Sequence, residues 1–284
     1  IYNMNSVKIK SYAKVNLALN VIGKNRSLHK IESIIAFVDL HDLILIRKIK
    51  SKTHKILFTG KFSSKIGKNN TVSKLIQILE KKNLLRDNKF EIITNKRIPS
   101  KAGLGGGSMN AASILKYFLK RKIVKISKKE IIQITKAIGS DVILGLNSTY
   151  SVLTSRNKIK NFKNFKPIHL LIVKPNFGCS TKEIYSKVKK FDKSLFNRPN
   201  KKMFTFDYLQ KMRNSLEPIA LAKYPKLKSV KVFLENLSGP IFVRMTGSGS
   251  ALVAYFQSKK KRDNVQKQFY KKYKNYWCAA AKTI

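Results

Sequence analysis

The sequence has few of the residues that form disulfide bonds and structural metal sites, with two cysteines and four histidines. Only two cysteines occur, Cys179 and Cys278, so no disulfide framework is indicated and a reducing cytoplasm is the expected compartment. No group of histidine and cysteine has the spacing of a metal site, and no structural metal is expected. No apolar run approaches the ~18 residues of a membrane-spanning helix. The lysines near the N-terminus precede no apolar core, so no signal peptide is expected there.

Acidic residues are also scarce. Lysine and arginine number 60 and aspartate and glutamate 14, which gives a formal net charge of +46. Taken alone, this charge indicates a nucleic acid or an anionic membrane as partner. Only ten of the basic residues are arginine, however, and the lysines are spread along the whole chain. We therefore favour compositional drift at tolerant surface positions, with neither a specific nucleic acid nor a membrane as partner.

A stretch rich in glycine stands out near the middle of the chain. Four of the thirteen glycines lie between residues 103 and 107, after a strand-like alternation at 90–94 and before a helical pattern at 110–120. This order predicts a phosphate site, because the first amides and the positive dipole end of the helix point to one place. The loop lacks the Gly-Lys-Ser/Thr of a P-loop, and Ser108 replaces the last glycine of a dinucleotide fingerprint. A flexible turn is the alternative.

The 284 residues can hold one large domain or two of ordinary size. Strand-like and helix-like patterns alternate in mixed order, which indicates an α+β fold with two layers in each of two domains. The segment 155–166 consists mostly of lysine, asparagine and phenylalanine and is expected to link the halves. We place the N-terminal domain at residues 1–156 and the C-terminal domain at residues 157–284.

Three local predictions follow from pattern and turn chemistry. Residues 39–42 (Asp-Leu-His-Asp) are typical of a turn between strands at 31–38 and 43–46. Ser127 and Glu130 form a capping box that opens a helix, which Gly139 ends. Residues 206–222 are predicted to form a single helix.

Two charged residues lie in otherwise apolar surroundings. Asp141 follows the helix that ends at Gly139 and precedes an apolar run, so we expect it near the core, where a carboxylate needs a counter-charge or a task. Capping the next helix is its alternative role. Lys14 lies in an apolar strand, where a period of two places it on the same face as Asn16. The alternative is that Lys14 is an ordinary lysine at the edge of a sheet. Pairing Lys14 with Asp141 is a hypothesis from spacing and the scarcity of acids.

Together these motifs resemble those of the GHMP small-molecule kinases, and the resemblance spans nearly the whole chain in order. Within that superfamily the chain is similar to the branch that phosphorylates the 2-hydroxyl of a cytidine-diphosphate alcohol in non-mevalonate isoprenoid precursor biosynthesis. The motifs that carry the resemblance are Lys14-Val15-Asn16-Leu17, residues 29–33 ending at Asp39-Leu40-His41-Asp42, Gly103-Leu104-Gly105-Gly106-Gly107-Ser108, Cys179 to Tyr185, Asn214-Ser215-Leu216-Glu217, and the Thr246-Gly247-Ser248-Gly249 turn.

The resemblance implies an N-terminal domain with a mixed sheet, which carries ATP and catalysis, and a C-terminal domain like an α/β plait. It implies Lys14 and Asp141 as catalytic residues, with Mg²⁺ arriving with ATP and Ser108 as its candidate ligand. The implied nucleotide-binding residues are Asn70, Lys96, Pro99, Gly103, Leu104, Gly105, Gly106, Gly107 and Ser108. The implied substrate-binding residues are Asn16, His29, Thr181, Tyr185, Gly247 and Ser248, with cytidine read by Asn16 and His29 and stacked on Tyr185.

The chain departs from this family at residues 26–27, where Arg-Ser replaces the usual Asp-Gly, at Lys101, which intrudes in the glycine loop, and at two further positions. Leu28 stands where the family usually has a tyrosine opposite Tyr185, and Met109 stands where a second serine is usual. A kinase of the homoserine or mevalonate type, a basic nucleic-acid-binding protein and an inactive kinase are the alternative interpretations. The expected assembly is a monomer or a weak homodimer.

Overall fold

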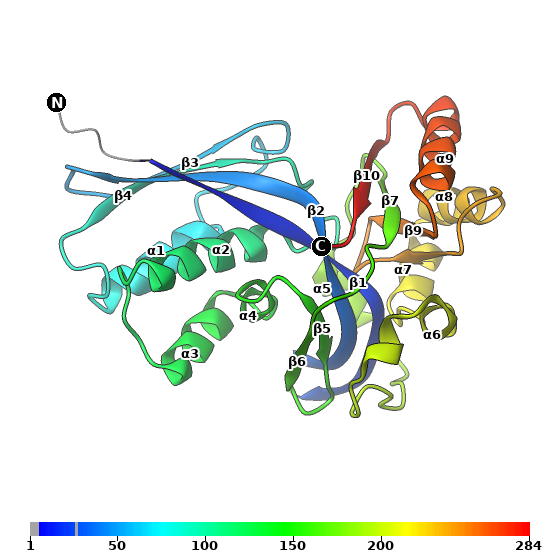
Figure 1. Cartoon of the computed structure of the whole chain (residues 1–284), viewed down its shortest axis with the longest axis horizontal. Coiled ribbons are helices and arrows are strands. Elements are labelled where there is room, and N and C mark those ends of the chain that lie inside the picture. The colour runs from blue at the N-terminus through cyan, green and yellow to red at the C-terminus, as the bar shows by residue number, and fades with distance from the viewer. Residues whose placement is uncertain (1–5, 26–27) are drawn as a thin grey trace. The chain divides into compact units, whose positions relative to one another are not determined.

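The structure is a computed structural model of the chain, and it describes residues 6–25 and 28–284 (Figure 1). The strands are β1 (Val7–Asn25), β2 (Leu28–Ile49), β3 (Lys55–Thr59), β4 (Lys89–Asn95), β5 (Tyr150–Leu153), β6 (Ile159–Phe162), β7 (His169–Lys174), β8 (Phe242–Met245), β9 (Leu252–Phe256) and β10 (Trp277–Lys282). The α-helices are α1 (Thr71–Lys81), α2 (Gly106–Lys120), α3 (Lys128–Ile138), α4 (Val142–Gly145), α5 (Thr181–Ser186), α6 (Phe206–Gln210), α7 (Glu217–Lys223), α8 (Pro225–Glu235) and α9 (Lys259–Lys272), with a 3-10 turn, η1, at Lys201–Phe204.

The internal contacts of the chain divide it into two compact units. Among the described residues, the first unit holds 6–13, 40–100 and 105–148, and the second unit holds 14–25, 28–39, 101–104 and 149–284. By residue, therefore, strands β1 and β2 belong partly to each unit. These contact units interleave along the chain, and the linear domain boundary expected between residues 156 and 157 stays a prediction.

In the first unit, helices cover one side of a sheet. Strand β4 lies between β3, which is parallel to it, and the part of β2 from Leu43 to Ile49, which is antiparallel to it. Figure 1 shows α1 and α2 side by side beneath these strands. The side chains between sheet and helices form an apolar core because the helices present stripes of buried residues to it. Its members include Ile44, Ile46, Leu75, Leu79, Phe90, Ile92, Leu115 and Phe118.

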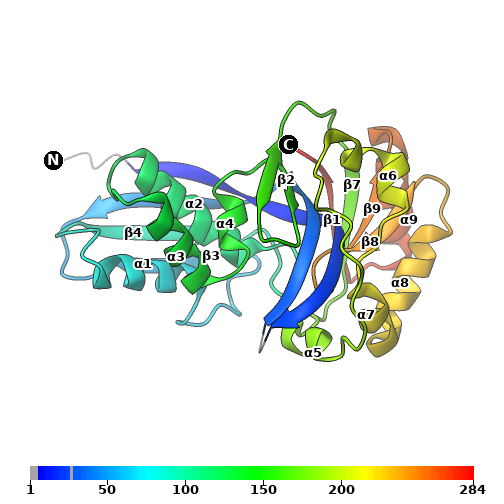
Figure 2. The same ribbon diagram turned by 90° about the horizontal axis from the view of Figure 1, so that it is seen from below.

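The second unit contains an antiparallel sheet in the order β10-β7-β9-β8. Helices α8 and α9 contact this sheet and lie along the same side of it (Figure 2). Residues 14–25 of β1 and 28–39 of β2 also belong to this unit, where Ser33 to Ile35 of β2 pairs with β5. The core includes Leu171, Val173, Leu216, Leu227, Leu234, Leu252, Phe256 and Phe269.

Strand β2 continues through residues 39–42, so the turn predicted there is wrong. An aspartate promotes a turn when its side chain bonds to its own neighbouring backbone. Here both aspartates bond to distant segments instead. Asp39 Oδ1 accepts a hydrogen bond from Lys282 N at 2.9 Å, and Asp42 Oδ1 accepts one from Arg97 N at 2.7 Å. The backbone of β2 therefore stays extended.

Two further local predictions are corrected by the structure. The segment 155–166 is more than a link, because it contains β6, which pairs antiparallel with β5. The single helix predicted over residues 206–222 is interrupted, because α6 ends at Gln210 and α7 begins at Glu217. Between them the backbone bonds to β1: Leu19 N donates to Arg213 O at 3.0 Å, and Ser215 N donates to Leu19 O at 2.8 Å. Such bonds to a strand edge exclude a continuous helix.

Other predictions are confirmed. The capping box is formed, with Ser127 Oγ accepting from Glu130 N at 3.3 Å and Glu130 Oε2 accepting from Ser127 N at 2.8 Å. Helix α3 then ends at Ile138, before Gly139. Strands and helices occur together in each unit, as the predicted α+β class requires. Within residues 6–25 and 28–284, none of the helices combines the length and the apolar character needed to cross a membrane.

Candidate active site

The second half of the glycine loop leads directly into helix α2. Gly105 takes the left-handed conformation, with φ of 69°, at the N-cap of this helix. The first backbone bond of the helix runs from Met109 N to Gly105 O at 2.9 Å. The amides of Gly106, Gly107 and Ser108 precede that bond and belong to the first turn, where the helix itself offers no partner. The expected order of strand, loop and helix N-terminus is confirmed along the chain.

A buried ion pair lies beside this first turn. Lys96, which is 3% exposed, pairs with the fully buried carboxylate of Asp42. A Cβ atom added to Gly106 would lie 3.4 Å from Lys96 Nζ and 3.1 Å from Ile98 Cγ2, so both side chains flank the glycine. Asp42 also accepts from Ile98 N at 2.9 Å. One carboxylate therefore fixes the lysine and the turn that follows it.

The start of helix α1 contacts the same loop. Thr71 Oγ1 donates to Gly107 O at 2.6 Å, which joins the first turns of α1 and α2. Asn70 caps α1: its Oδ1 accepts from Val72 N and Ser73 N, each at 3.0 Å. The assignment of Asn70 to the nucleotide stays a prediction, and so does that of Pro99, which is buried in the segment after Lys96.

Asp141 occupies the position before α4 without capping it. Its backbone has φ of −83° and ψ of −12°, and its side chain makes no capping hydrogen bond. The capping role considered from the sequence is therefore wrong. A Cβ atom added to Gly139 would lie 3.9 Å from Ser108 Oγ, so the Gly-Ser-Asp segment reaches the first turn of α2. The first unit thus brings together the part of the glycine loop from Gly105 onward, Lys96, Ser108 and the segment that carries Asp141.

In the second unit, Lys14 and Asn16 form one buried polar cluster. Lys14 Nζ donates to Asn16 Oδ1 at 2.6 Å, and Asn16 Nδ2 donates to Ser33 Oγ at 2.8 Å. The two side chains therefore share a face of β1, as predicted. Lys14 and Asn16 are 4% and 3% exposed. Because a buried ammonium requires polar partners, Asn16 holds the lysine side chain in one orientation.

The two glycine turns of the chain meet in the second unit. A Cβ atom added to Gly103, which has φ of 74°, would lie 2.0 Å from Thr246 O, so only glycine fits at this position. Asn16 N donates to Thr246 Oγ1 at 2.9 Å. Beyond this turn, Ser248 Oγ lies 2.8 Å from Thr181 Oγ1. The predicted substrate residues Asn16, Thr181, Gly247 and Ser248 are thus joined through one turn.

Asn214 belongs to the candidate site, although the sequence did not indicate a role for it. Its side-chain amide Nδ2 donates to Met245 O at 2.7 Å and to Gly247 O at 2.8 Å, so it shapes the turn at 246–249. The Asn-Ser-Leu-Glu motif that contains Asn214 contributes to the family resemblance, but the sequence assigns this residue no function. Asp42 and Thr71 were likewise missed, although the scarcity of acids was a signal for Asp42.

His29 and Tyr185 lie next to each other in the second unit. Their ring centroids are 5.0 Å apart and their planes make an angle of 40°. Burial and, to a lesser extent, the charge of Lys24 lower the pKa of His29. The Tyr185 ring is partly buried and packs against the apolar core. Leu28 is 76% exposed.

The residues assigned from the sequence fall in both units. Lys14, Asn16, His29, Gly103, Leu104, Thr181, Tyr185, Gly247 and Ser248 belong to the second unit, and Asn70, Lys96, Pro99, Gly105, Gly106, Gly107, Ser108 and Asp141 to the first. The pairing of Lys14 with Asp141 stays a prediction.

Comparison with known families and proteins gives matches along almost the whole chain. The GHMP kinases N terminal domain matches residues 70–153, and the GHMP kinases C terminal domain matches residues 188–275. A protein of Pelagibacter ubique (strain HTCC1062), named 4-diphosphocytidyl-2-C-methyl-D-erythritol kinase, is 54% identical over 281 residues, which cover 99% of this chain and 100% of that protein. A protein of the same name from Clostridium botulinum (strain Langeland / NCTC 10281 / Type F) is 34% identical, with 93% and 96% covered.

Solved structures with the same fold include kinases of different alcohols. A crystal structure of 4-(cytidine 5'-diphospho)-2C-methyl-D-erythritol kinase has a TM-score of 0.78 at 22% identity and covers 98% of this chain and 99% of its own. A homoserine kinase from Cytophaga hutchinsonii has a TM-score of 0.70 at 16% identity, with 100% and 96% covered. At these identities the likeness establishes the fold, and the GHMP kinase fold expected from the sequence is confirmed.

Proposed function

Since this chain belongs to the family of 4-diphosphocytidyl-2-C-methyl-D-erythritol kinases, a branch of the GHMP kinases, we propose that it transfers the γ-phosphoryl group of ATP to the 2-hydroxyl of 4-(cytidine 5'-diphospho)-2-C-methyl-D-erythritol. The chain is a kinase, and membership of the GHMP kinases implies the use of ATP. The acceptor follows from the names of relatives that match the full length of the chain. The product would serve isoprenoid precursor biosynthesis.

The first turn of α2 fits the phosphates of ATP. Amides at a helix N-terminus and the positive end of the helix dipole favour an anion. The glycines at 106 and 107 keep this backbone free of side chains, and the Lys96 ammonium lies beside Gly106. In this proposal Gly105 to Ser108 hold the phosphates, and the Lys96 ammonium, which Asp42 holds in place, lies beside them. Mg²⁺, for which Ser108 is the proposed protein ligand, neutralises phosphate charge when it is bound.

Asp141 and Lys14 carry the proposed chemistry. Asp141 accepts or orients the proton of the 2-hydroxyl, because an ionised carboxylate is the acceptor that a weakly acidic alcohol needs. Lys14 stabilises the negative charge that develops during transfer, and its bond to Asn16 fixes the direction of its ammonium. Phosphoryl transfer depends mainly on positioning and electrostatics, which a few polar groups can supply.

The second unit supplies the proposed contacts to the acceptor. His29 and Asn16 read the cytosine by hydrogen bonds, and Tyr185 offers the face on which the base stacks. Thr181, Gly247 and Ser248 contact the rest of the substrate from one turn. The observation that carries this assignment is the neighbouring position of the His29 and Tyr185 rings.

Turnover with different acceptors tests the proposed function. The purified chain is assayed for ADP formation with ATP and Mg²⁺ and, separately, the cytidyl alcohol, homoserine and mevalonate. We expect turnover with the cytidyl alcohol alone. Preference for homoserine or mevalonate would reassign the substrate class, and absence of turnover with all three would favour an inactive kinase.

The net charge of +46 is the single observation that favours a nucleic-acid role. We propose that it reflects drift, and that the chain acts in the cytoplasm as a monomer or weak homodimer. Binding to nucleic acid should then be indifferent to sequence and should fall steeply with salt, because it depends on counterion release. Sequence-selective retention in a filter-binding assay at physiological salt would contradict this. Sedimentation velocity tests the assembly state.

A further inference from the structure

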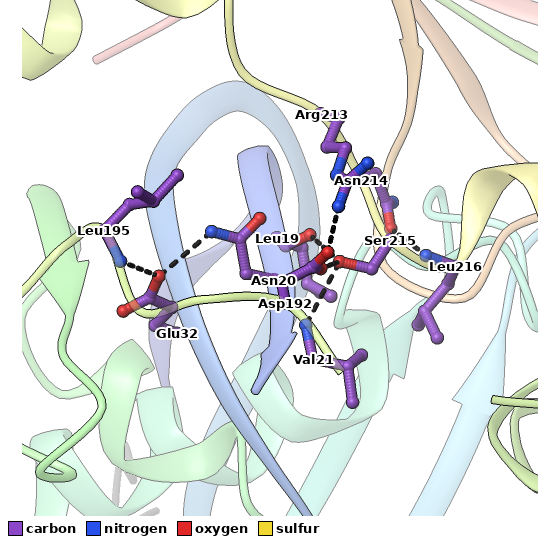
Figure 3. Close-up of polar contacts among 10 residues, drawn as sticks. All are labelled: Leu19, Asn20, Val21, Glu32, Asp192, Leu195, Arg213, Asn214, Ser215 and Leu216. Carbon is purple, nitrogen blue, oxygen red and sulfur yellow. Dashed lines mark hydrogen bonds and ion pairs between the residues drawn. The ribbon is translucent and has the colours of Figure 1, made fainter. Parts of the chain in front are cut away.

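Glu32 is a fully buried carboxylate with a complete set of hydrogen-bond donors. Its Oε1 accepts from Asn20 Nδ2 at 2.9 Å and from Leu195 N at 2.6 Å, as Figure 3 shows. Its Oε2 accepts from Ser194 Oγ at 2.8 Å and from Phe196 N at 3.1 Å. A buried charge of this kind is tolerated only because every oxygen is bonded. The proposed chemistry of the site uses none of these bonds.

Three of the four donors come from one segment, residues 187–196, which we call the strap. The strap follows α5, and Glu32 lies on β2. Asp192 also anchors the strap to β1, because its backbone amide donates a hydrogen bond to Val21 O at 2.8 Å. The Asp192 side chain also contacts Arg213 and the hydroxyl of Ser215 (Figure 3). The carboxylate of Glu32 and the backbone amide of Asp192 thus fasten the strap to the β1–β2 hairpin of the second unit.

The positive charges of the strap and of the hairpin oppose the packing of these two segments against each other. Four of the seven residues from 187 to 193 are lysines, and the hairpin carries Lys24 and Lys30 near its tip. Like charges on the two segments repel each other, although salt screens the exposed ones. The bonds at Glu32 do not depend on a lysine partner, because they are made by backbone amides, a hydroxyl and an amide side chain.

The anchors lie close along the chain to the aromatic pair. His29 precedes Glu32 by three residues on β2, and Tyr185 precedes Asp192 by seven residues. Fixing the strap to the hairpin therefore closes a short loop that contains the contact between the two rings. A short closed loop leaves few conformations to its members. The anchors add hydrogen bonds to the ring contact between Tyr185 and His29 along this path.

We propose that Glu32 is a positioning residue for substrate recognition, which holds the strap on the hairpin and so keeps Tyr185 against His29. This proposal rests on the proposed function, in which the cytosine of the acceptor binds to the His29 and Tyr185 rings. Glu32 does not touch the reacting groups. Its loss should therefore affect binding of the acceptor and leave ATP binding and the chemical step in place.

The test compares E32Q with the wild-type chain. Glutamine keeps the size of the side chain but replaces one carboxylate oxygen by a donor, which then faces donors. We expect tryptic cleavage after Lys189, Lys190 or Lys193 to accelerate about tenfold, the factor expected when a charged hydrogen bond is lost. We expect the KM for the cytidyl alcohol to rise by about the same factor, with kcat and the KM for ATP within about twofold.

A matched control is E235Q, which removes the charge of an exposed glutamate paired with Lys231 on α8. It should leave cleavage and both KM values unchanged. If E32Q does not fold, S194A removes one donor and leaves the amides of Leu195 and Phe196 in place, and a smaller effect in the same direction is expected.

Two results would overturn the proposal. One is unchanged cleavage of the strap in E32Q. The other is faster cleavage without a selective change in the KM for the cytidyl alcohol. This KM would then stay unchanged or would rise by the same factor as the KM for ATP, as general destabilisation would give. Failure of the proposed function would show in the wild-type chain as absence of turnover with the cytidyl alcohol. In that case the NMR signals of the His29 ring, compared between wild type and E32Q without ligand, decide whether Glu32 holds the aromatic pair together.

Discussion

Asp42 and Lys96 form an ion pair in which both side chains are almost completely withdrawn from water. The carboxylate also accepts hydrogen bonds from the amides of Arg97 and Ile98, at 2.7 and 2.9 Å. Lys96, which directly follows β4, is therefore held beside Gly106 by a carboxylate of β2. In a buried pair each partner compensates the desolvation of the other, so removal of one leaves a costly charge.

Asp42→Asn should weaken ATP binding and destabilise the fold. Asparagine can still accept from the backbone amides but no longer holds the Lys96 ammonium beside Gly106, and breaking a buried pair costs ~3–5 kcal/mol. We expect a higher KM for ATP, an unchanged KM for the cytidyl alcohol and a lower free energy of unfolding in urea. Asp39→Asn is the control, since its oxygen can still accept from Lys282 N. An unchanged KM for ATP in Asp42→Asn would show that Lys96 has no part in nucleotide binding.

Asp141→Asn should retain the fold and ATP binding and lose turnover. The side chain caps no helix, so its charge is not needed to begin α4. Removal of a general base typically lowers the rate by ~10²–10⁴-fold. Steady-state kcat, together with ATP affinity from calorimetry, measures both quantities. Asp87→Asn, at an exposed position of the same unit, is the control. A near-normal kcat for Asp141→Asn would remove this residue from the mechanism.

Tyr185→Ala should raise the KM for the cytidyl alcohol without changing ATP affinity. Stacking of a base on an aromatic ring contributes ~1–3 kcal/mol, and Leu28 offers no second aromatic face. The ring also packs on the core, so some loss of melting temperature is expected as well. Leu28→Tyr should have the opposite effect on KM. A lower melting temperature with an unchanged KM would reduce Tyr185 to a packing residue.

Because of His54, the free energy of unfolding should decrease in mild acid. Burial lowers the pKa of His54, and the carboxylate of Glu80, 3.1 Å from Nε2, only partly offsets this. Below the ordinary histidine value of about 6.5 the unfolded chain binds a proton that the folded chain resists, so the free energy of unfolding decreases as pH falls. Melting temperatures between pH 7.5 and 5.5 measure the decrease. It should be smaller in His54→Asn, which keeps an acceptor for Phe90 N, and an equal decrease would contradict the assignment.

The sequence could predict local features whose partners are close along the chain. Ser127 and Glu130 cap α3 because they are three residues apart, and Lys14 and Asn16 share a face because a strand repeats every two residues. The glycine loop was recognisable because its strand and helix flank it directly. Each of these depends on spacing, which a sequence displays.

Features that depend on distant partners could not be predicted in the same way. The residues 39–42 looked like a turn because nothing local shows that Asp42 bonds to Arg97 and Asp39 to Lys282. The break between α6 and α7 follows from backbone bonds to Leu19, which is about two hundred positions earlier in the sequence. Three of the four donors to Glu32 likewise lie in the strap, far from Glu32 along the chain. Tertiary hydrogen bonds, rather than local preference, decided these segments.

The close fit of Gly103 against the carbonyl of Thr246 limits how this chain can be recombined with a related kinase. The two turns approach backbone to backbone, and a Cβ atom on Gly247 would in turn lie 3.0 Å from Gly103 O. A shift of one turn by a fraction of an ångström must therefore be matched by the other, although 143 residues separate the contacting positions. Chimaeras of two related kinases should accordingly inherit both turns from one parent. A crossover placed between them would combine backbones that were fitted in different proteins.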